Sequence, residues 1–336
     1  MKAFQMTRFG LEHLQPVDLP EPVPGPGDVL VRVHAASLNY RDLMLLRGHY
    51  DPKLHMPRIP LSDGAGEVTA VGKAVTRFRV GDRVAGLFFQ NWQDGGPSSS
   101  KSQGALAGDL DGMLAQYVAL PERGVVHFPD HLSYQEAATL PCAGVTAWRA
   151  LTVASKVQPG DTVLVQGTGG VSIFALQFAK LAGARVLGTS SSDQKLARAK
   201  LLGLDAGANY KGRPDWSAWV KEQTGGLGAD VVVEVGGAGT FGQSIQAVRV
   251  GGTVVQIGVL SNAEEKLSVV PLLMRQVQIA GIMVGSRAMF EAMNRAISLH
   301  GIRPVIDREF PLQEARAAYE YLEGGQHFGK VVISLG

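Results

Sequence analysis

The hydrophobic pattern of the chain changes at Thr162. Before this residue, short runs alternate apolar and polar side chains, which is typical of strands that bury one face. Such strands are expected at 28–35, 64–71 and 83–87, and a proline-rich connection is expected at 20–27. After Thr162, continuous apolar runs alternate with helical patterns, and this alternation predicts a parallel sheet with helices between its strands. The pattern therefore predicts an α/β protein whose first part is rich in β-structure.

The second part of the chain predicts a regular series of elements. Strands are expected at 162–166, 185–189, 231–235, 253–258, 278–282 and 330–334. Helices are expected at 172–182, 193–202, 241–248, 289–300 and 312–323. In the first part, the segment 90–112 is polar and long for a connection, which is typical of a functional lid, with a tolerated surface insertion as the alternative.

Composition and charge narrow the class of protein. The 336 residues suggest two domains, and contents of 45% hydrophobic and 18% charged residues argue against intrinsic disorder. The sequence contains no membrane-span pattern and no secretory signal, so we expect a cytoplasmic protein without membrane contact. A net charge of +2 without a dense basic run argues against nucleic-acid binding. The single cysteine, Cys142, excludes an internal disulfide and a multi-cysteine zinc site.

A glycine-rich loop separates the first buried strand from the first helix of the series. Glycines in this position let the backbone approach a pyrophosphate, and the helix N-terminus supplies N–H groups and a positive dipole. Ser172 stands where the third glycine of the usual fingerprint would be. We expect a dinucleotide-binding loop, with a purely structural turn as the alternative. The residues expected to hold the cofactor are Gly167, Thr168, Gly169, Gly170 and Val171.

The end of the next strand indicates which dinucleotide is bound. An NAD site usually offers a carboxylate to the ribose at this point, but here the strand ends in Ser190 and Ser191, and Lys195 follows. Hydroxyl groups and a lysine suit a 2′-phosphate, so NADP(H) is favoured over NAD(H). Asp193 keeps NAD(H) open, and Ser192 or Asp193 could simply cap the next helix.

Further cofactor contacts are expected where later parallel strands end. Ligands bind at the carboxyl ends of the strands in open α/β sheets. Val235 and Gly236 follow one of these strands, and Gly258 ends another. These three residues are therefore predicted to contact the cofactor.

Several motifs along the chain resemble those of the medium-chain dehydrogenase/reductase superfamily. They are SLNYRD at 37–42, GAGEV at 64–68, VGDRV at 80–84, LPCAGVTA at 140–147 and GKVV at 329–332. The resemblance covers essentially the whole chain, and its nearest likeness is to the zinc-independent quinone oxidoreductases and the related enoyl reductase domains. Together these motifs are specific for the superfamily and much less specific for a substrate.

The resemblance implies a division of the chain and an assembly. A GroES-like, β-rich catalytic domain would span 1–135 and be completed by 287–336, while a doubly wound (Rossmann) parallel-sheet cofactor domain would span 136–286. The active site would lie in the cleft between them. Family dimers commonly form through the last strand of the cofactor sheet, here near 278–282, so a homodimer is expected.

The resemblance also assigns residues to the cofactor. Thr146 is expected beside the nicotinamide, and Tyr210 matches a tyrosine that helps Lys195 to hold the 2′-phosphate. Phe328 and Lys330 are expected to border the cofactor from the catalytic domain.

No zinc is expected. In zinc alcohol dehydrogenases of this superfamily, the first metal cysteine falls where Asn39 stands, the His-Glu pair falls at Ser62 and Asp63, and the remaining cysteine falls at Cys142. An amide, a hydroxyl, a carboxylate and one thiol make a poor tetrahedral zinc site. The structural zinc lobe would fall near 90–112, where there is no cysteine.

Without a metal, side chains must stabilise the negative charge that hydride transfer creates on the substrate. Asn39 can donate a hydrogen bond through its amide, and Tyr50 matches a proposed proton donor of the enoyl reductase branch. Asp42 could position these groups. Each has an alternative role, since Asn39 could fix a turn, Asp42 could cap a helix and Tyr50 could be a packing residue.

These residues predict an NADPH-dependent, zinc-independent oxidoreductase. Its substrate would be a small quinone or α,β-unsaturated carbonyl compound. An alcohol dehydrogenase or ketone reductase of the same superfamily is the alternative within enzymes. A cofactor-binding structural or regulatory protein is the alternative outside them.

Overall fold

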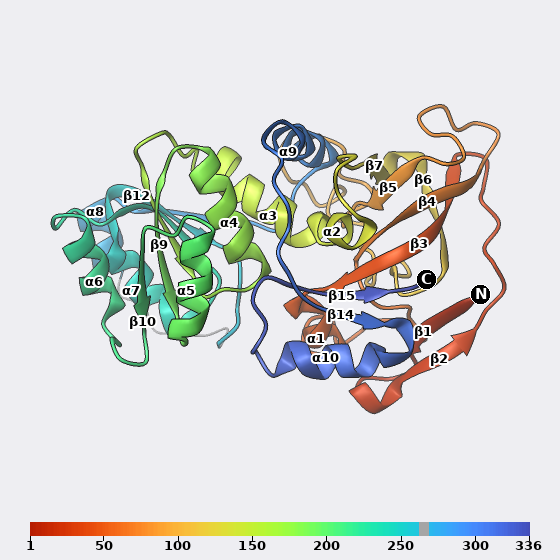
Figure 1. Cartoon of the computed structure of the whole chain (residues 1–336), viewed down its shortest axis with the longest axis horizontal. Coiled ribbons are helices and arrows are strands. Elements are labelled where there is room, and N and C mark those ends of the chain that lie inside the picture. Colours follow the sequence, from red (N-terminus) through yellow and green to blue (C-terminus); the bar gives the residue numbers. More distant parts are fainter. Residues whose placement is uncertain (262–268) are drawn as a thin grey trace. The chain divides into compact units, whose positions relative to one another are not determined.

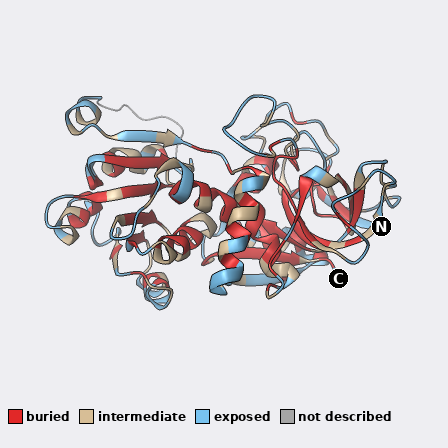
Figure 2. Ribbon diagram, turned by 90° about the horizontal axis from the view of Figure 1, so that it is seen from above, coloured by how far each residue is buried: buried red, intermediate tan, exposed pale blue. Residues whose placement is uncertain are grey.

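A computed structural model describes residues 1–261 and 269–336 of the chain (Figure 1). The chain divides into two compact units. The first unit comprises Met1–Val145 and Val284–Gly336, and the second comprises Thr146–Met283. Buried residues are concentrated on the strands and the inner faces of helices (Figure 2). Each unit therefore has a core of its own, and the two are described separately.

The first unit is built mainly from antiparallel strands. Its strands are β1 (Lys2–Met6), β2 (Leu14–Asp18), β3 (Asp28–Leu38), β4 (Asp63–Val71), β5 (Arg83–Gly86), β6 (Tyr117–Pro121), β7 (Val125–His127), β14 (Ile306–Pro311) and β15 (Lys330–Ser334). Its helices are α1 (Tyr40–Leu46), α2 (Tyr134–Ala138), α9 (Arg287–His300) and α10 (Ala315–Glu323), with a π-helical segment at Leu140–Gly144 and 3-10 turns at Leu11–His13, Glu122–Gly124 and Leu312–Glu314. The seven-stranded sheet of the described residues has the order β14-β15-β3-β4-β5-β7, with β6 also paired to β3.

Strand β3 lies at the centre of this sheet and pairs with both β4 and β15. It pairs with β4 so that Ser37 lies opposite Asp63, and it pairs with β15 so that Leu38 lies opposite Val331. The first residues of β4 and β15 therefore reach the end of β3, where α1 begins. This register brings segments close together that are far apart in the sequence.

The second unit is a parallel sheet with helices between its strands. Its strands are β8 (Thr162–Gln166), β9 (Arg185–Ser190), β10 (Ala206–Asn209), β11 (Ala229–Glu234), β12 (Val248–Gln256) and β13 (Gln278–Gly281). Its helices are α4 (Gly170–Leu181), α5 (Asp193–Leu201), α6 (Trp216–Gln223), α7 (Ala238–Ala247) and α8 (Val270–Arg275), preceded by α3 (Val145–Arg149) at the boundary and a π-helical segment at Ala150–Ala154. The strand order β10-β9-β8-β11-β12-β13 is that of a doubly wound dinucleotide-binding sheet. The predicted fold class is confirmed.

The structure differs from the predicted elements in several places, and β1, β2, β6, β7, β14, α2, α3, α6 and α8 were not predicted. Strand β3 extends to Leu38, three residues beyond the predicted 28–35, because its last residues are buried between β4 and β15. The expected helix at 312–323 is a 3-10 turn followed by α10. Strand β10 was not predicted, since its sequence AGAN lacks the β-branched and aromatic residues that mark strands.

The segment 90–112 is folded onto the first unit. It forms turns and isolated bridges, and the side chain of Trp92 is buried with 1% exposure. The Trp92 indole N–H donates to the carbonyl oxygens of Asp94 at 3.2 Å and Gly95 at 3.1 Å. The segment thus contributes to the core of this unit. Among the helices of the described residues, none has the length and hydrophobicity needed to cross a bilayer.

Candidate functional site

The loop between β8 and α4 is shaped to receive a phosphate group. Gly167 has a φ of +68°, and a Cβ added there would meet no atom within 4 Å, so open space faces the backbone at this point. Gly169 caps α4 without a side-chain acceptor, which leaves the first N–H groups of the helix available to an anion. Ser172 is buried, and its hydroxyl donates to the carbonyl oxygen of Gln166 at 2.6 Å. The serine at the third glycine position therefore ties the helix to its strand.

The residues predicted at the adenine ribose lie together at one edge of the second unit. Strand β10 pairs with β9 so that Asn209 lies opposite Ser190, and the N–H of Tyr210 donates to the carbonyl oxygen of Ser190 at 3.0 Å. The hydroxyl of Ser192 accepts from the N–H of Lys195 at 3.3 Å, so the predicted helix cap is confirmed. This edge carries hydroxyl groups and a lysine, as a 2′-phosphate requires.

A buried carboxylate that was not predicted as a site residue supports the loop after β11. Glu234 ends β11 and is fully buried. Its Oε1 accepts from the N–H groups of Gly236 at 2.7 Å and Gly237 at 3.0 Å, and from the Thr240 hydroxyl at 2.6 Å. Its Oε2 accepts from the Gln166 amide at 2.8 Å. An acidic residue at the end of the apolar run VVVE was the available signal, because a buried charge needs such partners.

The remaining predicted cofactor residues are mostly buried or tightly packed. A Cβ at Gly258 would lie 2.1 Å from the carbonyl oxygen of Val235, so the close approach of these two loops requires glycine. Thr146 is buried in α3, and Phe328 is buried just before β15. The contacts of these residues with a cofactor stay predictions.

Two predicted residues of the first unit, Asn39 and Lys330, come together where β3 ends. Asn39 is the N-cap of α1, and Lys330 is the first residue of β15. Lys330 is 3% exposed, and its ammonium donates to the Leu38 carbonyl oxygen at 2.5 Å and to Asn39 Oδ1 at 2.6 Å. Lys330 was predicted to border the cofactor, whereas its contact with Asn39 was not predicted.

Asp63 and Cys142 complete this cluster. Asp63 Oδ1 accepts from the Ser62 hydroxyl at 2.7 Å, and Oδ2 accepts from the backbone N–H of Cys142 at 3.0 Å. Burial raises the pKa of Asp63, whereas the Lys330 ammonium, the hydrogen bond from Ser62 and the nearby Asn39 amide lower it. Burial lowers the pKa of Lys330, and the Asp63 carboxylate opposes this effect. Burial also raises the pKa of Cys142, so its sulfur stays a thiol.

Asp42 is a buried residue that caps α1, and its carboxyl group has a raised pKa. Its Oδ2 accepts from the backbone N–H of Asn39 at 2.7 Å, so the capping alternative is confirmed. Burial raises the pKa of Asp42 to about 7, although the positive charge of Arg41 lowers it. Asp42 Oδ1 and the buried Tyr319 hydroxyl both lack a hydrogen-bond partner among the described residues. A neutral carboxyl and a charged one are thus both accessible near pH 7.

Tyr50 lies beside the same helix. Its side chain is 38% exposed, and the Arg41 guanidinium carbon lies 5.0 Å from the centre of its ring. The same guanidinium lies 4.6 Å from the Phe88 ring, and it donates to the carbonyl oxygen of Leu106 at 3.0 Å. Arg41 therefore connects α1 and Tyr50 to the folded segment 90–112.

The donor set at this cluster does not suit zinc. In the part of the chain that the structure describes, no group of three or more His, Cys, Asp or Glu side chains could hold a metal ion. The positions that match the metal ligands of zinc alcohol dehydrogenases carry Asn39, Ser62, Asp63 and Cys142, and the ammonium of Lys330 bonds to the first of them. A fixed cation beside an amide and a protonated thiol opposes the binding of a second cation.

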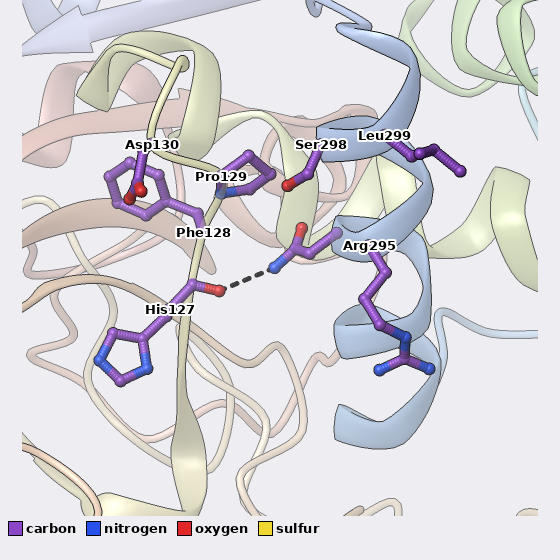
Figure 3. A pocket seen from close by; sticks show the side chains of 8 residues that line it. His127, Phe128, Pro129, Asp130, Arg295, Ser298 and Leu299 are labelled. Atoms are coloured by element: carbon purple, nitrogen blue, oxygen red, sulfur yellow. Dashed lines mark hydrogen bonds between the residues drawn. The ribbon is translucent and has the colours of Figure 1, made fainter.

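A surface hollow in the first unit involves none of the predicted site residues (Figure 3). It lies between the end of β7 and α9, and the Asn294 amide donates to the His127 carbonyl oxygen across it at 2.8 Å. Its lining consists of His127, Phe128, Pro129, Asp130, Asn294, Arg295, Ser298 and Leu299.

Two family models and several relatives match the chain. The family described as an alcohol dehydrogenase GroES-like domain matches residues 25–130, and the family described as a zinc-binding dehydrogenase matches residues 170–298. A zinc-type alcohol dehydrogenase-like protein from Schizosaccharomyces pombe is 44% identical over 333 residues, which are 97% of this chain and 96% of the relative. An acryloyl-coenzyme A reductase from Metallosphaera sedula is 30% identical over 325 residues, 94% and 95% of the two chains.

Solved structures agree over the whole length. A candidate alcohol dehydrogenase from Sinorhizobium meliloti 1021 has 43% identity and a TM-score of 0.93, covering 99% of this chain and 98% of the other. An NAD-dependent alcohol dehydrogenase has 37% identity and a TM-score of 0.92, covering 100% of both chains. A mycobacterial protein in complex with NADPH has 28% identity and a TM-score of 0.85, covering 100% of both.

The fold, the phosphate loop and these relatives define a two-domain oxidoreductase that uses a nicotinamide cofactor. The chain belongs to the medium-chain dehydrogenase/reductase superfamily, as its motifs indicated.

Proposed function

We propose that the protein is an NADPH-dependent, zinc-independent reductase of a small quinone or α,β-unsaturated carbonyl compound. The observation that carries this proposal is the cluster at the end of β3, where the Lys330 ammonium bonds to Asn39 instead of a metal. Such a cluster offers hydrogen-bond donors to a developing oxyanion, whereas its amide, hydroxyl, carboxylate and protonated thiol are poor ligands for a metal that would bind an alkoxide. Reduction of a conjugated acceptor needs only these donors and a proton.

Side chains of the first unit would stabilise the negative charge that develops on the substrate and would supply the proton. When bound, the nicotinamide ring supplies the hydride. The Asn39 amide would donate a hydrogen bond to the substrate oxygen as negative charge develops on it. The Tyr50 hydroxyl would deliver the proton, with its ring held beside the Arg41 guanidinium. Asp42 would fix the start of α1 and with it the position of Asn39.

NADPH is proposed as the preferred cofactor because of the edge formed by β9 and β10. Ser190, Ser191, Lys195 and Tyr210 would bind the 2′-phosphate through hydroxyl and ammonium donors. Asp193 is exposed at the first turn of α5, where it could instead contact a ribose hydroxyl. NAD(H) is therefore the alternative cofactor.

An activity screen with metal analysis tests the proposed reaction. Purified protein is mixed with NADPH and a panel of quinones, enones, saturated ketones and aldehydes, and the absorbance of NADPH is followed. We expect oxidation with quinones or enones, unchanged by prior dialysis against a chelator, and less than stoichiometric zinc in the same sample. Activity confined to saturated ketones and aldehydes together with one zinc per chain would instead establish the alcohol dehydrogenase that several relatives' names describe.

A homodimer is proposed as the assembled form in the cytoplasm. Strand β13 lies at the edge of its sheet, where Ile279 is exposed, and Leu273 and Met274 of the neighbouring α8 are also exposed. A second copy would cover this apolar surface and pair with the open edge. We expect the mass from light scattering to correspond to two chains, and Ile279→Lys to shift it toward one chain, whereas Val23→Lys in the first unit should not.

A further inference from the structure

Lys330 is a buried cation for which the proposed reaction has no direct use. Strand β15 lies beside β3, and this pairing holds Lys330 next to Asn39 (Figure 1). An ammonium group carries three donors and no acceptor. The Asn39 amide must therefore present its oxygen to Lys330, and its orientation is fixed by chemistry as well as by packing.

The amide nitrogen of Asn39 is consequently directed away from the ammonium. Asn39 Nδ2 is buried and has no partner at hydrogen-bond geometry among the described residues, although the amide lies close enough to Asp63 to lower the pKa of that carboxyl. An amide NH₂ group carries two donors, so at least one of them has no acceptor among the described residues. A buried donor without an acceptor destabilises the protein, and a substrate oxygen that accepts from it would remove this cost.

We propose that Lys330 is a positioning residue that orients and polarises the Asn39 amide for the substrate oxyanion. This inference rests on the proposed function, in which Asn39 donates that hydrogen bond. A hydrogen bond from a cation to the amide oxygen strengthens the amide N–H groups as donors, because linked hydrogen bonds polarise one another. A charge fixed by the fold also needs no reorganisation when the oxyanion forms.

The Asp63 carboxylate favours the charged form of this lysine. The Asp63 carboxylate is itself fixed by Ser62 and by the Cys142 N–H. Its negative charge stabilises the buried ammonium, which would otherwise favour the neutral amine. The fixed charge that a metal provides in the zinc branch is thus supplied here by a side chain, acting through an amide.

A double-mutant cycle tests the inference. Lys330→Met and Asn39→Leu are made singly and together, and kcat is measured with the best acceptor of the screen. NADPH affinity is measured separately from the change in cofactor fluorescence. We expect each single variant to lower kcat at least tenfold and to change the NADPH Kd less than twofold. We expect the double variant to be no slower than Asn39→Leu, because both changes remove one interaction.

Two further variants separate positioning from folding. Lys330→Met leaves Asp63 as an unpaired buried carboxylate, which destabilises the fold. A variant that combines Lys330→Met with Asp63→Asn is therefore also made. It lacks both charges, and we expect it to recover the melting temperature but not kcat. Lys330→Arg, which again presents only donors, should recover part of kcat. Lys73→Met replaces an exposed lysine of the same unit and should change neither property.

The outcomes distinguish the inference from the proposed function. An unchanged kcat in Lys330→Met, or losses that simply multiply in the double variant, would overturn the positioning role while leaving the reaction intact. A rise in the NADPH Kd without a fall in kcat would overturn it in favour of a cofactor contact. An unchanged kcat in Asn39→Leu would instead remove Asn39 from the proposed mechanism.

Discussion

The two candidate regions of this enzyme are built from different kinds of groups. In the second unit, the cofactor region consists mainly of backbone, since Gly167 and the start of α4 offer N–H groups. In the first unit, the candidate catalytic region consists of side chains from distant segments, with Lys330 contacting Asn39 and the Cys142 N–H contacting Asp63. A backbone site tolerates most side-chain changes nearby, whereas a side-chain cluster depends on every member.

Lys195 is the residue of the cofactor region at which we expect a side-chain change to have the largest effect. Replacing Lys195 with alanine removes a positive charge from the 2′-phosphate but nothing from the rest of the loop. We expect the KM for NADPH to rise about ten- to hundredfold, roughly 1.4 to 2.7 kcal/mol of binding free energy, while the KM for NADH changes less than twofold. Steady-state kinetics with both cofactors measure the difference.

A control on the same helix tests whether the effect is local. Lys200 is exposed near the end of α5, and Lys200→Ala should leave both KM values unchanged. Equal increases of both KM values in Lys195→Ala would contradict the 2′-phosphate assignment, because NADH lacks that group.

The sequence signals for the proposed cofactor region are local. The loop at 167–171 follows a buried strand and opens a helix, and each of these elements is visible in a short window. The hydroxyl residues at the end of β9 lie within a few positions of Lys195. Tyr210 was placed by resemblance alone, and β10, the strand before it, has no hydrophobic signal.

The candidate catalytic cluster was predicted only in part. Asn39 and Asp42 stand in one motif, and the capping of α1 was foreseen as an alternative role for Asp42. The contact of Lys330 with Asn39 joins residues separated by 291 positions, and only the register of β15 on β3 creates it. Glu234 escaped attention for a related reason, because its partners on α7 are recognised only once the strand and helix are packed.

The smallest expected effect concerns the pH dependence of stability in the side-chain cluster. Burial raises the pKa of Asp42 to about 7, above its value in the unfolded chain, so the folded state holds this proton more tightly. The stabilisation from that proton is complete below the unfolded pKa and is lost as pH rises through 7. Between pH 6 and 8 we expect the wild type to lose about 1 kcal/mol more unfolding free energy than Asp42→Asn, as measured by urea titration at both pH values.

Asp215 caps α6 as an exposed carboxylate with a lowered pKa, so Asp215→Asn should reduce stability equally at both pH values. If Asp42→Asn and the wild type lose the same free energy over this range, Asp42 is fully ionised in the folded protein, and its burial is compensated more completely than its neighbours Arg41 and Lys330 account for.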